Sequence, residues 1–249
     1  MAVEINLENK VALVTGGTRG IGKAIVNELL QSGAKVFATG TNLKQVEKLN
    51  KENKNSLLTY LQLDLSDTNN LRKFISKTLK VTDIDILINN AGINIVSDAD
   101  IISDEEFLQI QEINVHGPFL LAQAFGKQML NKNWGRIINI SSVWGVVTRP
   151  GRLSYSASKM ALLGISKTLA VEWAKNNVLV NSVSPGFTLT ELTKETNTKQ
   201  ELKEIENNIP QKRLAFPKEI AKGVLFLSSN LNSYIVGQNL IIDGGYTAI

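Results

Sequence analysis

Tyr155 and Lys159 are the residues whose types and spacing point most directly to chemistry. The segment 154–175 has the pattern of a helix, so two side chains four residues apart share one face of it. A phenol has an ordinary pKa of about 10, too high for a base near neutral pH. A Lys ammonium about 5 Å away favours the phenolate by about 3 kcal/mol, or about 2 pKa units, so the pair could exchange a proton with a substrate.

The spacing by itself is weak evidence for such a site. About 0.3 Tyr-x-x-x-Lys pairs are expected by chance in a chain of this composition, and an ordinary surface pair explains one well. Ser142 adds to the case, because it follows the apolar run 136–140 and could donate a hydrogen bond to a substrate oxygen. Ser141 competes for that role. Such a set suits carbonyl reduction, in which a nicotinamide supplies hydride and a side chain supplies the proton.

A glycine-rich loop near the start of the chain could hold the nicotinamide dinucleotide. Gly16, Gly20 and Gly22 lie between an apolar run and a helical pattern, where glycines let the backbone approach a pyrophosphate at the helix N-terminus. Their spacing, G-x-x-x-G-x-G, differs from the G-x-G-x-x-G fingerprint and is expected about 0.1 times by chance. The alternative is a plain glycine-rich turn.

The residues after the second apolar run favour NADP(H) over NAD(H). NAD-selective sites carry an acid there for the ribose 2′-hydroxyl, whereas FATGTN (37–42) has none. Arg19 in the glycine loop could pair with a 2′-phosphate, and Thr41 could donate a hydrogen bond to it.

The elements that must position these residues alternate as β-α-β. Nearly continuous apolar runs predict strands buried on both faces, at 11–15, 35–39, 57–63, 85–89, 136–140, 179–183 and 239–243. Between them, the pattern predicts a helix over 22–33 with Gly33 at its C-terminus, and a helix beginning near Asn69 with Ser66 or Asp67 as its cap. We therefore expect an α/β fold, a Rossmann-type doubly wound parallel sheet of seven strands flanked by helices.

The composition narrows the function classes. The 249 residues contain no cysteine, which excludes disulfides, Cys-based zinc sites and thiol catalysis, and we expect no metal site. Scattered basic residues at a net charge of +4 indicate a solvated surface without a nucleic-acid partner. No apolar stretch is long enough to span a bilayer, and the first residues lack a signal-peptide pattern, so we expect a cytoplasmic protein that does not bind membranes.

We expect one domain over residues 1–249 that binds the dinucleotide and performs the chemistry. The polar, helix-forming segment 190–216 interrupts the β-α rhythm just after a strand. It could be a substrate lid or a surface insertion.

The motifs, taken in order, resemble those of the short-chain dehydrogenase/reductase family over the whole chain. They are TGGTRGIG (15–22), LDL (63–65), NNAG (89–92), Asn114, SS (141–142), YSASK (155–159), PG (185–186) and IDGG (242–245). Within the family, the arrangement is most similar to 3-oxoacyl-(acyl-carrier-protein) reductases.

This resemblance implies roles for individual residues. Tyr155 would be the general acid and base, Lys159 would lower its pKa and bind the nicotinamide ribose, and Ser142 would orient the carbonyl. Asn114 would maintain a proton-relay water near Lys159. The implied cofactor-binding residues are Gly16, Thr18, Arg19, Gly20, Ile21, Gly22, Thr41, Asp64, Leu65, Asn90, Ala91, Gly92, Tyr155, Lys159, Pro185, Gly186 and Thr188.

The resemblance also implies a homotetramer, packed partly through the helices that contain Asn114 and Tyr155. Carrier-protein reductases tend to carry basic residues before the fifth strand and after the Tyr/Lys helix. Here NKNWG (131–135) and AKNNV (174–178) supply Lys132 and Lys175 but no arginine. The substrate could therefore be a 3-oxoacyl thioester on acyl carrier protein. It could instead be a sugar, polyol, steroid or other small carbonyl or alcohol. A cofactor-binding regulatory protein without turnover is a third hypothesis. The presence of all four residues Asn114, Ser142, Tyr155 and Lys159 disfavours it.

Several other residues have a structural and a functional interpretation. His116, the single histidine, has no companion ligands and is expected to be structural. Asp83 and Asp85 precede a strand and are expected in a turn.

Trp144 could line the substrate site or simply pack in the core. Arg149 and Arg152, on either side of Pro150-Gly151, could meet an anionic substrate or remain solvated.

Overall fold

The computed structural model describes residues 4–195 and 197–248. Within them the apolar runs form a seven-stranded parallel sheet of order β3-β2-β1-β4-β5-β6-β7. Each predicted strand is confirmed, with ends that shift by no more than two residues. The strands are β1 (Val11–Val14), β2 (Lys35–Gly40), β3 (Leu58–Gln62), β4 (Ile86–Asn89), β5 (Gly135–Ile140), β6 (Val178–Pro185) and β7 (Asn239–Ile242).

Helices connect the strands, and α3 begins and α1 ends close to the capping residues that the sequence predicts. Asp67 accepts a hydrogen bond from the Asn70 amide (2.9 Å) at the start of α3, and Gly33, with φ of +89°, follows the end of α1. None of the described helices is long and apolar enough to cross a bilayer. The α-helices are α1 (Gly20–Gln31), α2 (Leu43–Glu52), α3 (Thr68–Val81), α4 (Asp104–Gln111), α5 (Gly117–Lys132), α6 (Leu153–Trp173), α7 (Glu191–Glu195), α8 (Lys199–Asn207) and α9 (Pro217–Ser228). A π-turn, η1 (Glu112–His116), and two short 3-10 turns, η2 (Val143–Gly145) and η3 (Ala174–Asn176), complete them.

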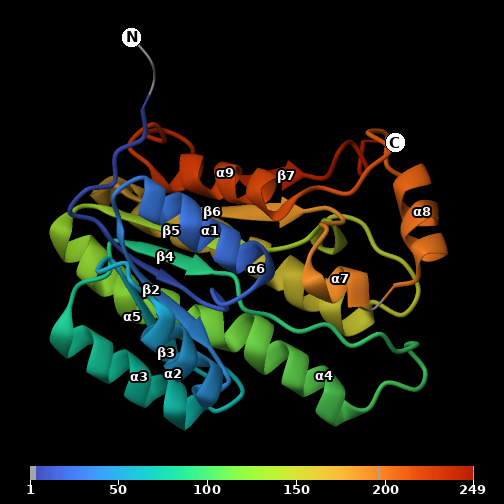
Figure 1. The fold of residues 1–249 in the computed structure, drawn as a ribbon, viewed down its shortest axis with the longest axis horizontal. Coiled ribbons are helices and arrows are strands. Elements are labelled where there is room, and N and C mark those ends of the chain that lie inside the picture. Colours follow the sequence, from blue (N-terminus) through green and yellow to red (C-terminus); the bar gives the residue numbers. More distant parts are fainter. Residues whose placement is uncertain (1–3, 196, 249) are drawn as a thin grey trace.

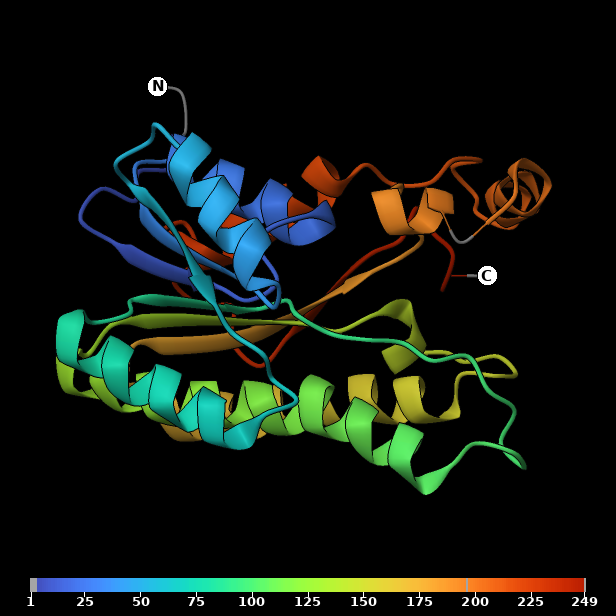
Figure 2. The same cartoon turned by 60° about the horizontal axis from the view of Figure 1, so that its bottom comes forward.

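The sheet is the middle of three layers (Figures 1 and 2). Helices α1, α2 and α9 cover one face, and α3, α5 and α6 cover the other. Successive β1 residues alternate between the two cores, since Ala12 and Val14 pack with α1 while Leu13 packs with α5. Burial on both faces explains the continuous apolar runs of the sequence.

The strand order reverses between β1 and β4, and this reversal locates the site. β1 pairs with β2 on one side and with β4 on the other, so Leu13 lies opposite both Phe37 and Leu87. Crossover helices diverge from this point and leave a crevice at the carboxyl ends of the strands. The loops after β1, β4, β5 and β6 all emerge at that edge.

The segment 190–216 forms two helices, α7 and α8, beyond the end of β6 (Figure 1). Thr198 begins α8 with a reciprocal capping box to Glu201. The side chain of Thr190 lies over the glycine loop, 3.4 Å from the position that a Cβ on Gly20 would take. One residue of the predicted lid, Thr196, lies outside the described residues.

Candidate active site

The loop between β1 and α1 has the shape that a pyrophosphate needs. Gly16 (φ +63°) and Gly20 (φ +55°) adopt left-handed backbone conformations, and a Cβ on Gly22 would lie 2.2 Å from the Gly16 carbonyl oxygen. Helix α1 begins at Gly20 without any side-chain cap on its N–H groups and without an acid in its first turn. Its N-terminus therefore offers unpaired donors and a positive dipole to an anion, which fits a dinucleotide. Ile21 faces the other way and packs against the core.

Thr15 and Asn90 join this loop to the end of β4. The Thr15 hydroxyl accepts hydrogen bonds from the amides of Asn90 (3.0 Å) and Ala91 (2.9 Å). The Asn90 side-chain amide donates to the carbonyls of Thr15 (2.8 Å) and Gly16 (3.2 Å). Our reading of the sequence missed Thr15, although a hydroxyl at the end of a buried apolar strand was the signal that could have found it.

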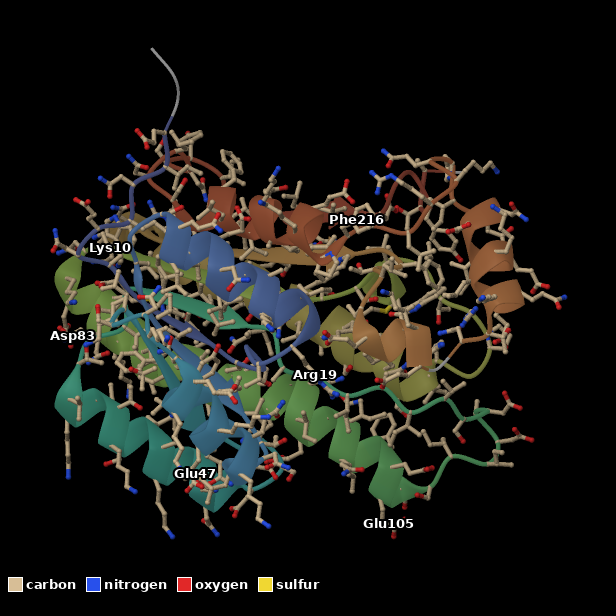
Figure 3. All side chains as sticks on the ribbon, viewed as in Figure 1. Lys10, Arg19, Glu47, Asp83, Glu105 and Phe216 are labelled. Carbon is tan, nitrogen blue, oxygen red and sulfur yellow. The ribbon has the colours of Figure 1, made fainter. Side chains whose placement is uncertain are left out.

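The residues expected to select the cofactor lie at the end of β2. A Cβ on Gly40 would lie 2.8 Å from the Thr18 methyl group, so the glycine loop packs against this strand end. Arg19 and Thr41 are both exposed. Figure 3 shows Arg19 beside the start of α1, where its guanidinium can approach a phosphate beyond β2.

The two residues expected at the adenine end differ in their surroundings. The Asp64 carboxylate accepts hydrogen bonds from the amide (2.9 Å) and the hydroxyl (2.7 Å) of Ser66. Leu65 is buried and fills the space that the missing side chain of Gly117 leaves on α5. Asp64 therefore shapes a turn, and Leu65 holds that turn to the core.

The residues after β6 form the opposite wall. Gly186 donates to the Ile242 carbonyl (2.9 Å), and a Cβ there would lie 2.7 Å from Asp243 Cα. Buried Thr188 donates to the Gly186 carbonyl (3.1 Å). Pro185 ends β6, so the backbone of 185–188 is held tightly against the end of β7.

Helix α6 and the end of β5 bring Ser142, Tyr155 and Lys159 together. Lys159 Nζ lies 5.4 Å from the centroid of the Tyr155 ring and donates to the Ile140 carbonyl (2.8 Å). Ser142 is hydrogen-bonded to the Tyr155 phenol. The Ser141 hydroxyl instead donates to the Lys159 carbonyl (2.9 Å), so it fastens α6 to β5, and Ser142 alone of the two reaches the phenol.

Burial dominates the electrostatics of this group. Desolvation raises the pKa of Tyr155, and the Ser142 hydrogen bond and the positive charge of Arg152 oppose that rise. Desolvation also lowers the pKa of Lys159 to about 8. The spacing of Tyr155 and Lys159 predicted that the ammonium would bring the pKa of Tyr155 below 10. The structure shows a raised pKa, because the cost of burying the phenolate exceeds the opposing effects.

Asn114 lies in the π-turn η1, a local irregularity that often marks functional sites. Its side chain accepts from the Ile93 amide (2.9 Å) and donates to the Ile93 carbonyl (2.8 Å) and to the Ser158 hydroxyl (3.1 Å). A Cβ on Gly92 would lie 3.0 Å from Asn114 Oδ1 and 3.4 Å from Lys159 Nζ. Gly92 thus lies between the two side chains, and its lack of a side chain allows their approach.

Other chemically capable residues have partners elsewhere. His116 Nδ1 is 2.9 Å from Glu112 Oε1, on the turn that holds Asn114. Lys132 Nζ lies 3.1 Å from a carboxylate oxygen of both Asp83 and Asp85. His116 thus contacts Glu112 and Lys132 forms ion pairs with the two aspartates before β4, so the partners of these residues do not include Tyr155.

Comparisons with known proteins agree with this geometry. A family model described as Enoyl-(Acyl carrier protein) reductase matches residues 16–247. The 3-oxoacyl-(acyl-carrier-protein) reductase FabG of Buchnera aphidicola subsp. Schizaphis graminum is 41% identical over 242 residues, which cover 97% of this chain and 98% of the relative. The NAD-dependent glycerol dehydrogenase of Listeria innocua is 37% identical over 245 residues, 98% of this chain and 96% of the relative.

Solved structures show the same architecture. A short chain dehydrogenase/reductase family protein superposes with a TM-score of 0.89 at 35% identity, over 98% of this chain and 100% of the other. A gluconate 5-dehydrogenase from Burkholderia cenocepacia, in complex with NADP and tartrate, superposes with a TM-score of 0.91 at 28% identity. The superposition covers 98% of this chain and 97% of the other.

The glycine loop yields a direct test of nucleotide binding. Gly22→Ala places a methyl group against the Gly16 carbonyl and the Asn90 amide, 2.2 and 2.6 Å away, and the loop must open. We expect the Kd for NADPH to rise about 10- to 100-fold, measured by calorimetric titration. Lys77→Ala is the control, because Lys77 is exposed on α3, away from the glycine loop. An unchanged Kd in Gly22→Ala would remove the loop from the nucleotide site.

Proposed function

The chain belongs to the short-chain dehydrogenase/reductase family, and from this premise we infer that it is an oxidoreductase that interconverts a ketone and a secondary alcohol with NADP(H). The observation that carries this inference is the convergence of Ser142, Tyr155 and Lys159 at the carboxyl edge of the sheet. The glycine loop and the start of α1, on the same edge, suit a dinucleotide.

Each polar side chain has a task that its position allows. When bound, the nicotinamide supplies hydride to the carbonyl carbon or accepts it from the alcohol. The Tyr155 hydroxyl donates a proton to the forming alkoxide and takes it back in the reverse direction, and Ser142 donates a hydrogen bond to the same oxygen. With a pKa of about 8, Lys159 is mostly protonated at neutral pH and favours the phenolate. Asn114, bonded to Ile93, holds the backbone beside Lys159 for a proton-relay water.

We propose NADP(H) as the preferred cofactor. The support is the absence of an acid at the end of β2, the exposed guanidinium of Arg19 beside the glycine loop, and the exposed hydroxyl of Thr41. The B. cenocepacia structure contains NADP. The L. innocua relative is described as NAD-dependent, so the charges near β2 carry this proposal more than the comparisons do.

Two substrate classes follow from the relatives. The B. aphidicola enzyme is a 3-oxoacyl-(acyl-carrier-protein) reductase, which supports a 3-oxoacyl thioester. The glycerol and gluconate dehydrogenases support a small polyol or sugar acid instead. One structural observation bears on this choice: Lys132, the basic residue before β5, already pairs with Asp83 and Asp85, whereas Lys175 is exposed.

We also propose that the chain assembles as a homotetramer through the faces of α4 and α6. Leu108, Met160 and Val171 on these helices expose 63%, 46% and 85% of their surfaces. Apolar side chains this exposed on neighbouring helices favour burial against another subunit.

Replacing Tyr155 by Phe tests the mechanism. The variant lacks the proton donor, so we expect kcat to fall by about 10²–10⁴-fold while the Kd for NADPH changes little. Tyr234→Phe is the matched control, because Tyr234 is 95% exposed and should keep full activity. Full turnover in Tyr155→Phe would refute the proposed role.

Arg19→Gln tests the cofactor preference. A charge-assisted hydrogen bond to a phosphate contributes about 1.5–3 kcal/mol, so the ratio of kcat/KM with NADPH to that with NADH should fall about 10- to 100-fold. The wild-type enzyme should favour NADPH in the same assay. A wild-type preference for NADH would refute the assignment of Arg19.

A screen of NADPH oxidation separates the substrate classes. It compares acetoacetyl thioesters with sugars, oxo acids and simple ketones at equal concentration. If Lys132 does not bind a carrier protein, the enzyme should turn over a carrier-protein-linked thioester at about the same rate as a small thioester. A gain of 100-fold or more would establish carrier recognition, and no turnover of any thioester would favour the small-molecule class.

A further inference from the structure

Two arginines occupy the turn that leads from Ser142 into α6. Arg152 is the residue just before α6, and its carbonyl accepts the Ser156 amide (2.7 Å) in the first helical turn. Tyr155 lies three residues further on. Gly151, at φ of +74°, makes the bend between the two arginines, and its carbonyl accepts the Ser97 amide (3.3 Å) from the loop after β4. These backbone contacts fix the turn that carries both arginines between Ser142 and Tyr155.

Arg152 is half-buried, and no residue that the structure describes is seen to accept a hydrogen bond from its side chain. Its Nε is enclosed without a hydrogen-bond partner among the described residues, although buried guanidinium donors are normally satisfied. Its charge stabilises the Tyr155 phenolate, and the charge of Arg149 in turn destabilises the charged form of Arg152. The two guanidiniums and the phenol therefore share one electrostatic neighbourhood.

Arg149 connects this neighbourhood to an aromatic wall. Its guanidinium carbon lies 5.2 Å from the centroid of the Trp144 ring, over its face. Trp144 packs edge-to-face with Phe187 (5.8 Å) and Tyr246 (6.0 Å), which come from the ends of β6 and β7. The Trp144 amide donates to Ser142 Oγ (3.2 Å), so this aromatic wall starts beside Ser142.

The two arginines differ from some other basic residues of the described chain in their lack of an ion-pair partner. Neither arginine forms an ion pair with a described carboxylate, whereas Lys132 pairs with two aspartates and Arg213 with Glu219. Asp98 is close, 3.9 Å from the Cβ position of Gly151, and still makes no ion pair with either arginine. Arg152, half-buried beside a reactive phenol and next to a like charge, therefore lacks a counter-ion that an anionic ligand could supply.

We propose that the substrate is a small oxo acid, or the corresponding hydroxy acid, whose carboxylate binds Arg152 with help from Arg149. This inference rests on the proposed function and narrows its substrate class. The planar fork of Arg152 suits a carboxylate, and binding it there places the ketone of the same molecule against Ser142 and Tyr155. The Trp144 wall encloses the short carbon chain. A thioester, neutral next to its ketone, leaves both charges unpaired.

The test compares acids with their methyl esters. Pyruvate, acetoacetate and 4-oxopentanoate span the carboxylate-to-ketone distance, and kcat/KM is measured for each acid and ester by NADPH oxidation. We expect at least one acid to exceed its ester by about 10-fold or more. In Arg152→Gln that acid-to-ester ratio should fall about 10- to 100-fold, mainly through KM, and Arg152→Lys should restore part of it. Arg72→Gln, an exposed arginine on α3, is the control and should keep the ratio.

Equal kcat/KM for every acid and ester, or an unchanged ratio in Arg152→Gln, overturns the proposal. A stronger preference for dihydroxyacetone phosphate than for every acid also overturns it, because the anion is then a phosphate. A second measurement does not need turnover. NADPH-loaded enzyme is titrated with lactate, 3-hydroxybutyrate and 4-hydroxypentanoate by calorimetry, and binding that Arg152→Gln weakens supports the anion site even if no ketone is reduced. In that case the proposed oxidoreductase function fails while the anion site stands.

Discussion

Hydrogen bonds between Thr15 and Asn90 join the ends of β1 and β4, and the site depends on that junction. These strands are neighbours only because the strand order reverses between them. The Thr15 hydroxyl and the Asn90 side-chain amide form hydrogen bonds with four backbone groups at the crevice. The glycine loop is thereby held at one edge of a rigid sheet, and the loops after β5 and β6 emerge at the same edge.

The same packing that positions the side chains of Lys159 and Tyr155 also sets their protonation. Lys159 is buried, and desolvation of its ammonium lowers its pKa to about 8 even though the Ile140 carbonyl accepts a hydrogen bond from it. Tyr155 is desolvated too, and its pKa rises. The phenol therefore stays protonated until another charge or hydrogen bond favours its anion. That state suits a proton donor, which must hold its proton until the alkoxide forms.

The substrate side of the crevice differs in character from the cofactor side. Backbone amides, glycines and helix dipoles dominate around α1, where a phosphate would be held by many partial charges. Full charges and aromatic rings dominate between Ser142 and Tyr155, where Arg149 stacks on Trp144 and the Nε of Arg152 has no acceptor among the described residues. Specificity for a small molecule comes from such a few oriented groups on an otherwise apolar wall.

The sequence by itself determined the strands, the glycine loop and the catalytic candidates. Burial on both faces requires apolar strands, tight turns require glycine, and proton transfer requires particular side chains. Each requirement can therefore be recognised in a short stretch of sequence. Tertiary structure alone distinguished Ser142 from Ser141 and showed that Lys132 is already paired. Burial in the folded chain also raises the pKa of Tyr155, whereas the spacing of Tyr155 and Lys159 had predicted that this pKa would fall. The tertiary structure also revealed Thr15 and the uncompensated charge of Arg152. Hydrogen-bond partners, desolvation and counter-charges come from residues far apart in the chain, and only the folded arrangement of the strands brings them together.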